Sequence, residues 1–235
     1  MSAPAPGTTR TVVHLLRHGE VHNPRGVLYG RRDGFHLSTR GLAMADKVAE
    51  ALGHRDIVHL RASPLERVQE TIAPLAAARG LAVRTDERVI ESGNVFEGER
   101  FGNGHNALKD PRTWRYLYNP WRPSWGEPYR LIVGRMMAAI HDARREAHGH
   151  EAVVVSHQLP IWTTRLHVEG RPFLHLPKNR RCTLCSVTSL HFDDERLVTL
   201  TYSEPAADQI PAAERAQAFS SGGVDADQNE IGGAG

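Results

Sequence analysis

The chain has 235 residues, of which 40% are hydrophobic and 24% charged, and its formal net charge is +2. This size allows one full hydrophobic core, and the near-neutral charge with scattered basic residues excludes a dedicated nucleic-acid binder. No apolar stretch reaches the ~18 residues of a membrane span, and residues 1–9 lack the features of a secretion signal, so we expect a cytoplasmic protein that does not bind membranes.

The chain divides into three parts. Residues 1–9 are small, Pro-containing and uncharged, which predicts a disordered leader. Residues 10–205 form one expected domain with an irregular insertion at 101–130, rich in Trp and Pro. The insertion either forms a lid over a substrate pocket or merely packs a long loop against the domain. Residues 206–235 have little to bury and predict a disordered tail.

Strands and helices alternate along the domain. The apolar run 11–16 predicts a strand buried on both faces, and after a long loop a helix is expected at 42–52 with Ser38 or Thr39 as its cap. Further strands are expected at 56–62, 81–84 and 152–156, further helices up to about 79, from 129 to 147 and up to about 168, and a hairpin at 184–192 and 197–202. This order predicts an α/β fold with a mostly parallel open sheet and helices on both faces.

Ser63 and Pro64 follow the second expected strand. A Ser cap with Pro at the first helical position is a strong helix start, which would place Arg67 about one turn inside the helix. From there its guanidinium can face an anion at the carboxyl edge of the sheet. A surface salt bridge of Arg67 with Glu66 or Glu70 is the alternative.

Several short motifs follow one another along the chain in an order that is typical of one protein family. They are Arg17-His18-Gly19-Glu20, then Ser63-Pro64-Leu65-Glu66-Arg67 with Thr71, then Glu91, and finally Ser156-His157. The set resembles the histidine phosphatase superfamily, also called the phosphoglycerate mutase-like family, and in particular the phosphatase type of its larger branch. The resemblance covers about residues 11–203 and implies that family's fold.

The arginines and histidines of these motifs can bind and transfer a phosphoryl group. Arg17 and Arg67 are planar cations that can together neutralise a phosphate of charge about −2. His18 is the candidate nucleophile, because a neutral imidazole can attack phosphorus and give a phosphohistidine that water hydrolyses. In the resembling family a backbone carbonyl beside the following glycine fixes the tautomer, and the counterpart of His157 hydrogen-bonds the phosphoryl oxygens.

The leaving group needs a proton, which a carboxylic acid can supply if nearby phosphate raises its pKa. Glu91 is the best candidate for this donor. The family has a later Trp-Glu-Gly, which the present Phe96-Glu97-Gly98 matches one residue short, so Glu97 is the alternative donor.

Two amides complete the predicted phosphate site. Asn23 matches a position where the family commonly binds phosphate with Asn, although Asn beside Pro24 is also typical of a turn. Gln158 stands where the family often has Gly, and it either contacts phosphate or narrows the pocket.

The sequence predicts neither a metal nor a cofactor. Cys182 and Cys185 form a lone Cys-x-x-Cys without a second pair for zinc, which indicates structural thiols. The predicted function is therefore metal-independent hydrolysis of a small phosphomonoester metabolite through a phosphohistidine.

Two other functions stay open. A mutase would share the first half-reaction, but the family's mutases carry Trp-Asn after the first motif and a longer basic insertion, whereas this chain has His22-Asn23-Pro24 and a short apolar 101–130. A non-catalytic phosphate-binding module is disfavoured because the candidate nucleophile and acid are both present. The substrate and the oligomeric state remain open, including a homodimer through an exposed sheet edge.

Overall fold

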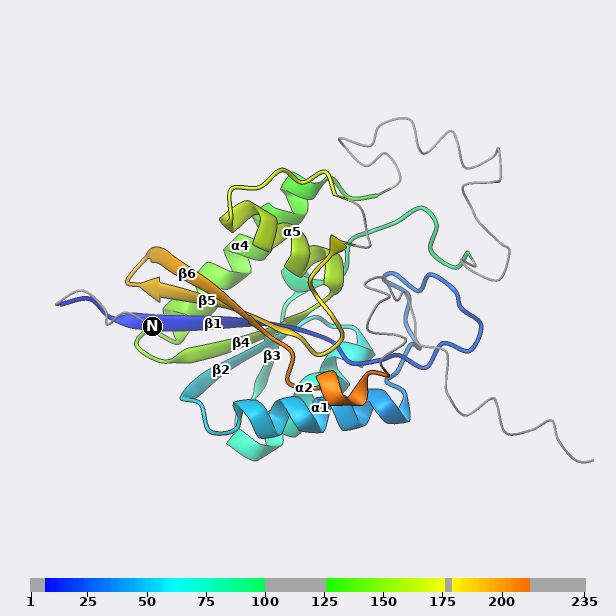
Figure 1. Ribbon diagram of the computed structural model, residues 1–235, viewed down its shortest axis with the longest axis horizontal. Helices are drawn as coiled ribbons and strands as arrows, with labels where there is room; N and C mark the ends of the chain where they lie inside the picture. The colour runs from blue at the N-terminus through cyan, green and yellow to red at the C-terminus, as the bar shows by residue number, and fades with distance from the viewer. Residues whose placement is uncertain (1–6, 100–125, 176–178, 212–235) are drawn as a thin grey trace, which may run out of the picture.

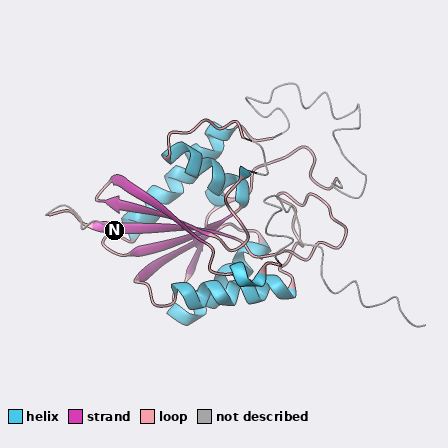
Figure 2. Ribbon diagram, viewed as in Figure 1, coloured by secondary structure: helices cyan, strands magenta, loops and turns pink. Residues whose placement is uncertain are grey.

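A computed structural model describes residues 7–99, 126–175 and 179–211. Its centre is a six-stranded sheet with the order β3-β2-β4-β1-β5-β6, and helices cover both faces (Figures 1 and 2). The strands are β1 (Arg10–Arg17), β2 (Ile57–Ala62), β3 (Val83–Thr85), β4 (Glu151–Ser156), β5 (Val187–Asp193) and β6 (Arg196–Ser203). The first four in spatial order run parallel, while β5 and β6 are antiparallel to their neighbours, which confirms the predicted mostly parallel sheet.

In the part of the chain that the structure describes, two α-helices lie on each face of the sheet. They are α1 (Thr39–Leu52) and α2 (Glu66–Arg79) on one face, and α4 (Tyr129–Glu146) and α5 (Gln158–Val168) on the other. Leu15 and Leu16 of β1 are both fully buried, but they pack into the opposite cores. Because side chains alternate across a strand, a strand covered on both faces must be apolar throughout, as the run in β1 is.

The strand register brings the predicted site together. Arg17 pairs with Ser156 across the parallel strands β1 and β4, and Ala62 of β2 pairs with Val155. These three strands therefore end at one edge of the sheet. Consequently His18 and His157, the residues that follow β1 and β4, leave the sheet side by side.

Local sequence signals explain most helix ends. The side chain of Ser38 accepts a hydrogen bond from the Gly41 backbone nitrogen at 3.0 Å, which confirms the predicted cap of α1. Gly80 ends α2 with a φ of 63°, a left-handed conformation that glycine adopts without strain.

The predicted start of α2 was wrong. Its cap position is Leu65, without a side-chain hydrogen bond, and the helix begins at Glu66 rather than at Pro64. The Ser63 hydroxyl lies instead 2.9 Å from a ring nitrogen of His157. Ser63 therefore contacts a residue far along the chain instead of capping the helix.

The predicted tail also needs a correction. Residues 206–211 belong to the folded domain, because Ala206 is buried, Ile210 packs on the core beside α1 and α2, and residues Ala207–Gln209 form the short 3-10 helix η4. A separate 3-10 helix, η1 (Glu87–Val89), follows β3. Residues 1–6 of the predicted leader, 101–125 of the predicted insertion and 212–235 of the predicted tail lie outside the described residues. None of the helices in the described ranges is both long and apolar enough to cross a membrane.

Candidate active site

His18 is almost completely buried at the end of β1. Its Nδ1 lies 2.8 Å from the backbone oxygen of Gly19. Since a carbonyl oxygen can only accept, Nδ1 carries the proton and Nε2 keeps its lone pair. Burial, and then the charges of Arg67 and Arg17, hold the pKa of His18 well below its usual value. The ring is therefore neutral and nucleophilic at neutral pH.

The turn after His18 is locked from two sides. The Gly19 nitrogen donates to the Thr71 hydroxyl at 3.0 Å, and that hydroxyl donates to the Arg67 backbone oxygen at 2.6 Å. A Cβ on Gly19 would lie 2.8 Å from the Gly41 carbonyl oxygen, and one on Gly41 would overlap the Glu20 backbone. Glycines at both positions thus allow the first turn of α1 to pack directly on the His18 loop.

Arg67 is fully buried beside the two histidines. Its Nη2 donates to the Gly30 backbone oxygen at 2.6 Å and lies 3.5 Å from Nδ1 of His157. Nε and Nη1 have no hydrogen-bond partner among the described residues, and the guanidinium lies 4.7 Å from the centre of the Tyr29 ring. Buried, unpaired N–H donors are expected where an anion binds.

The alternative role for Arg67 was wrong. Neither acid of its own helix pairs with it in a surface salt bridge: Glu66 accepts from the Gly34 nitrogen, and Glu70 accepts from the Leu37 nitrogen and lies beside His36. These carboxylates hold the long loop after β1 against α2.

Arg17 supplies the second guanidinium. Its side chain is buried, and Nη1 donates to the Cys182 backbone oxygen at 2.7 Å.

Cys182 and Cys185 are buried free thiols, and burial raises the pKa of Cys185 to about 12. Such thiols stay protonated and inert, as the structural interpretation of the pair predicted.

His157 faces His18, with ring centroids 5.2 Å apart. Its Nε2 contacts the Ser63 hydroxyl at 2.9 Å and its Nδ1 faces Arg67. Burial, followed by the charge of Arg67 and that of His18, holds the pKa of His157 well below its usual value. The structure therefore brings both predicted imidazoles and both predicted guanidiniums together.

Glu91 lies at the same site, after η1. Burial raises the pKa of its carboxyl, while a hydrogen bond from the Ser92 nitrogen and the charges of Arg67 and Arg17 oppose this rise. The Ser92 nitrogen donates to Oε1 at 2.8 Å, which orients the carboxyl. A carboxylic acid with a raised pKa remains protonated closer to neutral pH, as a proton donor must.

Arg135 of α4 holds the backbone that carries Glu91. Its guanidinium donates to the backbone oxygens of Arg88 at 2.8 Å, Ile90 at 2.6 Å and Glu91 at 3.3 Å. Nε of Arg31 also donates to the backbone oxygen of Glu91, at 2.7 Å. These bonds fix an otherwise irregular segment relative to the sheet edge.

Glu97, the alternative donor, has a local structural contact. Its Oε1 accepts from the Asn94 nitrogen at 3.2 Å, and its carboxyl group packs against Gly30 so closely that a Cβ there would overlap it. Glu91 is favoured as the donor, because burial raises the pKa of its carboxyl and the charges of Arg67 and Arg17 act on it.

The two predicted amides already have protein partners. Asn23 donates from Nδ2 to the Val27 oxygen at 2.9 Å and accepts from the Val27 nitrogen at 3.2 Å, which is the turn that the alternative interpretation described. Gln158 donates to the Cys182 oxygen at 3.3 Å and accepts from Nη1 of Arg180 at 3.3 Å. Their contact with phosphate stays a prediction.

Three residues at the site were missed from the sequence. Tyr29 lies against Arg67 and edge-on to His18, at 6.4 Å between ring centroids. Ser63 was interpreted only as a helix cap. Arg180 lowers the pKa of Glu91. In the sequence it is one of two adjacent arginines, Arg180-Arg181, in an irregular segment, which is typical of solvated surface residues and belongs to no motif.

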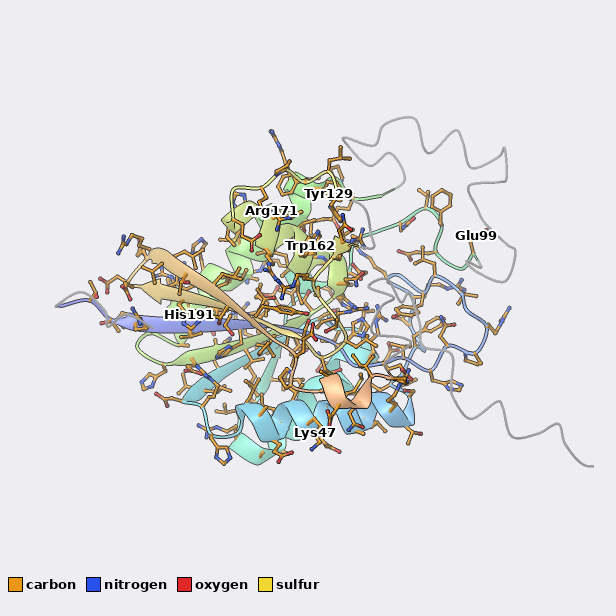
Figure 3. The ribbon with its side chains drawn as sticks, in the orientation of Figure 1. Lys47, Glu99, Tyr129, Trp162, Arg171 and His191 are labelled. Atoms are coloured by element: carbon orange, nitrogen blue, oxygen red, sulfur yellow. The ribbon has the colours of Figure 1, made fainter. Side chains whose placement is uncertain are left out.

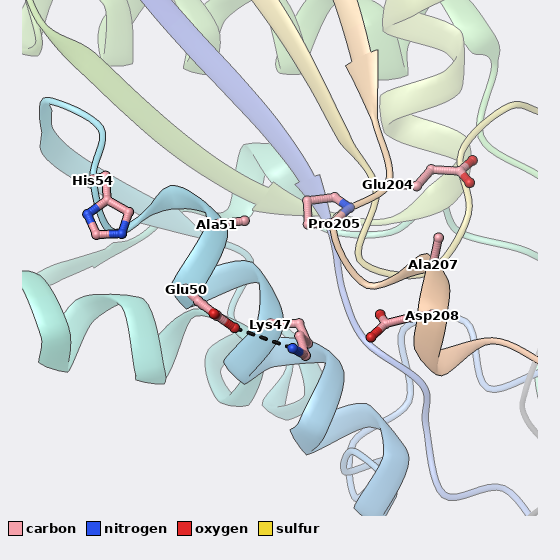
Figure 4. A pocket seen from close by; sticks show the side chains of 8 residues that line it. All are labelled: Lys47, Glu50, Ala51, His54, Glu204, Pro205, Ala207 and Asp208. Atoms are coloured by element: carbon pink, nitrogen blue, oxygen red, sulfur yellow. Dashed lines mark hydrogen bonds and ion pairs between the residues drawn. The ribbon is translucent and has the colours of Figure 1, made fainter.

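One surface pocket lies away from the predicted site. A surface pocket of about 480 Å³ lies between the end of α1 and η4, where Lys47 pairs with Glu50 beside Glu204 and Asp208 (Figure 4). None of the predicted site residues lines it. Within residues 7–99, 126–175 and 179–211, no group of three or more His, Cys, Asp or Glu side chains is arranged to hold a metal ion.

Comparisons with known proteins identify what this chain is similar to. The Mycobacterium tuberculosis (strain H37Rv) protein Rv0525 is 58% identical over 197 residues, covering 84% of this chain and 98% of that protein. Phosphoserine phosphatase 1 of Hydrogenobacter thermophilus is 27% identical, covering 79% and 89%. The solved structure of Bacillus stearothermophilus YhfR has the same fold, with a TM-score of 0.69, 21% identity and coverage of 80% and 95%.

The family model described as "Histidine phosphatase superfamily (branch 1)" matches residues 13–205, which include every predicted site residue. The chain therefore belongs to the histidine phosphatase superfamily and is built to handle phosphoryl groups.

Proposed function

We propose that this protein is a metal-independent phosphatase that hydrolyses the phosphomonoester of a small cytoplasmic metabolite through a phosphohistidine on His18. The observation that supports this most is the neutral His18 ring, which Gly19 orients and which lies beside the buried Arg67. A phosphoryl group bound by Arg17 and Arg67 would meet a lone pair on Nε2.

The proposed reaction has two steps. In the first, Nε2 of His18 forms a bond to phosphorus as the ester oxygen leaves with the proton of Glu91. In the second, water attacks the phosphohistidine, Glu91 takes up a proton from this water, and phosphate leaves from His18. Arg17, Arg67 and His157 would stabilise the phosphoryl oxygens throughout, so that positive charge is supplied by side chains.

Mutase-type phosphoryl transfer remains the alternative, because it shares the first step. The two activities differ in the product formed from 3-phosphoglycerate: hydrolysis releases phosphate, whereas a mutase forms 2-phosphoglycerate. His22-Asn23-Pro24, which stands after the first motif where the family's mutases have Trp-Asn, favours hydrolysis.

Turnover of 4-nitrophenyl phosphate and of a panel of phosphorylated metabolites that includes phosphoserine tests the proposal. His18→Ala should abolish turnover, while His167→Ala, at an exposed histidine of α5, should leave it unchanged. EDTA should not change the wild-type rate. Full activity of His18→Ala, or no phosphate release from any substrate by the wild type, would refute the proposed function.

A further inference from the structure

A third guanidinium, that of Arg180, is connected to Arg17 by three successive hydrogen bonds. The Cys182 backbone oxygen accepts from Nη1 of Arg17 at 2.7 Å and from the amide of Gln158 at 3.3 Å, and the oxygen of that amide accepts from Nη1 of Arg180 at 3.3 Å. A continuous chain of hydrogen bonds thus connects Arg17 with Arg180. Gln158 is the link between them.

A second contact orients Arg180. Its Nε donates to Nε2 of His175 at 2.9 Å, and Nδ1 of His175 lies 2.6 Å from the Phe173 backbone oxygen. Since that oxygen can only accept, Nδ1 carries the proton and Nε2 is an acceptor for the guanidinium. Burial, opposed by the bond to Phe173, lowers the pKa of His175, which keeps the ring in this neutral acceptor form.

Aromatic rings form the surroundings of this contact. The His175 ring lies 6.0 Å from Tyr129 of α4 and 5.9 Å from Trp162 of α5, measured between centroids. Figure 3 labels Tyr129 and Trp162, which lie near each other where α4 and α5 pack together. Rigid rings around His175 restrict the positions that Arg180 can take.

The charge of Arg180 reaches the proposed reaction centre. It lowers the pKa of Glu91. The pKa of Arg180 itself is lowered, mainly by burial and also by the charge of Arg17, while Tyr129 and Glu91 oppose this shift. A phosphate dianion carries about two negative charges, which Arg17 and Arg67 already match. Arg180 is therefore a cation beyond the need of the phosphoryl group, and it lies on the side of the site formed by α4 and α5.

We propose that Arg180 is a specificity residue that binds a second anionic group of the substrate, a carboxylate or a second phosphate, close to the reacting phosphoryl group. The inference rests on the proposed function and names the substrate class: phosphomonoesters with a further negative charge. A planar guanidinium that His175 and Gln158 orient from two sides is suited to bind such a group with charge-assisted hydrogen bonds.

Three substrates with similar carbon skeletons test the proposal: 3-phosphoglycerate, propane-1,3-diol bisphosphate and glycerol 3-phosphate, the last without a second anion. For Arg180→Gln, kcat/KM should fall about ten- to hundredfold more on one of the two doubly anionic substrates than on glycerol 3-phosphate. The substrate that is affected identifies the anionic group. Most of the change should appear in KM, and Arg180→Lys should restore part of the loss.

Arg181→Gln is the matched control. It removes the same charge one residue away, where the exposed guanidinium lies 5.3 Å from the Tyr202 ring, and it should leave all three rates unchanged. An equal loss of Arg180→Gln on all three substrates, or the same loss in Arg181→Gln, would overturn the proposal. Absence of wild-type turnover on any phosphomonoester would instead refute the proposed function itself.

Discussion

The Ser63 hydroxyl lies 2.9 Å from Nε2 of His157, and both groups are fully buried. A hydroxyl can donate or accept, so it suits either tautomer of the ring. When Ser63 donates to Nε2, Nδ1 of His157 carries the proton and can donate to a phosphoryl oxygen. When phosphate is absent, Nδ1 can accept from Arg67 instead, and Ser63 then accepts from Nε2.

Ser63→Ala should therefore weaken phosphate binding in the transition state. We expect kcat/KM to fall about ten- to hundredfold, the usual effect of losing the hydrogen bond that the oriented His157 ring would donate to the charged phosphoryl group. Ser189→Ala is the matched control, because it also removes a buried Ser–His bond, the 2.7 Å contact with His14, but outside the site. Steady-state kinetics and thermal melts of both variants would decide: if only stability falls in Ser63→Ala, the hydroxyl has no role in positioning His157.

Glu91→Gln should reduce hydrolysis most where the leaving group is poor. Alkyl phosphates need a proton at the leaving oxygen, so their kcat should fall by about 10²–10⁴, whereas 4-nitrophenyl phosphate should lose far less. Glu97→Gln is the comparison and should show no such dependence. A plot of rate against leaving-group pKa for each variant gives the measurement. An equal loss on both substrate types would assign the acid to another residue.

The pH dependence follows from two opposite pKa shifts. Burial raises the pKa of Glu91, and the acid must be protonated to act, so kcat/KM on alkyl phosphates should decline as the pH rises through that raised value. Burial and Arg67 lower the pKa of His18, so the nucleophile stays neutral until the pH falls well below the usual pKa of a histidine. Alkyl phosphates should thus be hydrolysed best under mildly acidic conditions.

The control for this profile is Glu91→Gln. Because the substrate phosphate itself titrates near pH 6, only the difference between the wild-type and variant profiles reports on Glu91. If both profiles have the same descending limb, Glu91 is not the group that titrates.

Gly41 tests the packing of the nucleophile loop. A methyl group at this position would overlap the Glu20 backbone, so Gly41→Ala should cost about 1–3 kcal/mol of stability and should also reduce kcat by displacing His18. Gly134→Ala is the control within a helix: nothing lies within 4 Å of its new methyl, and it should gain about 0.5–1 kcal/mol. Denaturant unfolding would measure both changes, and equal behaviour of the two variants would contradict the close packing.

The sequence was sufficient to predict where the histidines lie. His18 and His157 follow apolar runs that read as buried strands, and parallel strands necessarily end at a common edge, so their meeting could be inferred before any coordinates. The place of Arg67 followed from the same edge, because a helix after β2 brings its first turn there, although the helix begins at Glu66 rather than at Pro64. In each case a local pattern and a general rule of sheet topology agreed.

Other parts depended on contacts that local patterns do not encode. Ser63 has a strong capping signal, but its hydroxyl bonds to a residue far along the chain instead. Arg180 lies in an irregular segment, and its link to Arg17 runs through the side chain of Gln158 and one backbone oxygen. Arg135 holds the Glu91 segment by backbone oxygens, which leave no trace in the sequence pattern.

The central claim is that His18 forms a covalent bond to phosphorus during turnover. Rapid mixing with a ³²P-labelled phosphomonoester, quenching in alkali and peptide mapping would detect it directly, because phosphohistidine survives base and is lost in acid. The account predicts an acid-labile label on the peptide that contains His18, formed within one turnover, and none in His18→Ala. A label on another residue, or steady turnover in His18→Ala, would contradict it.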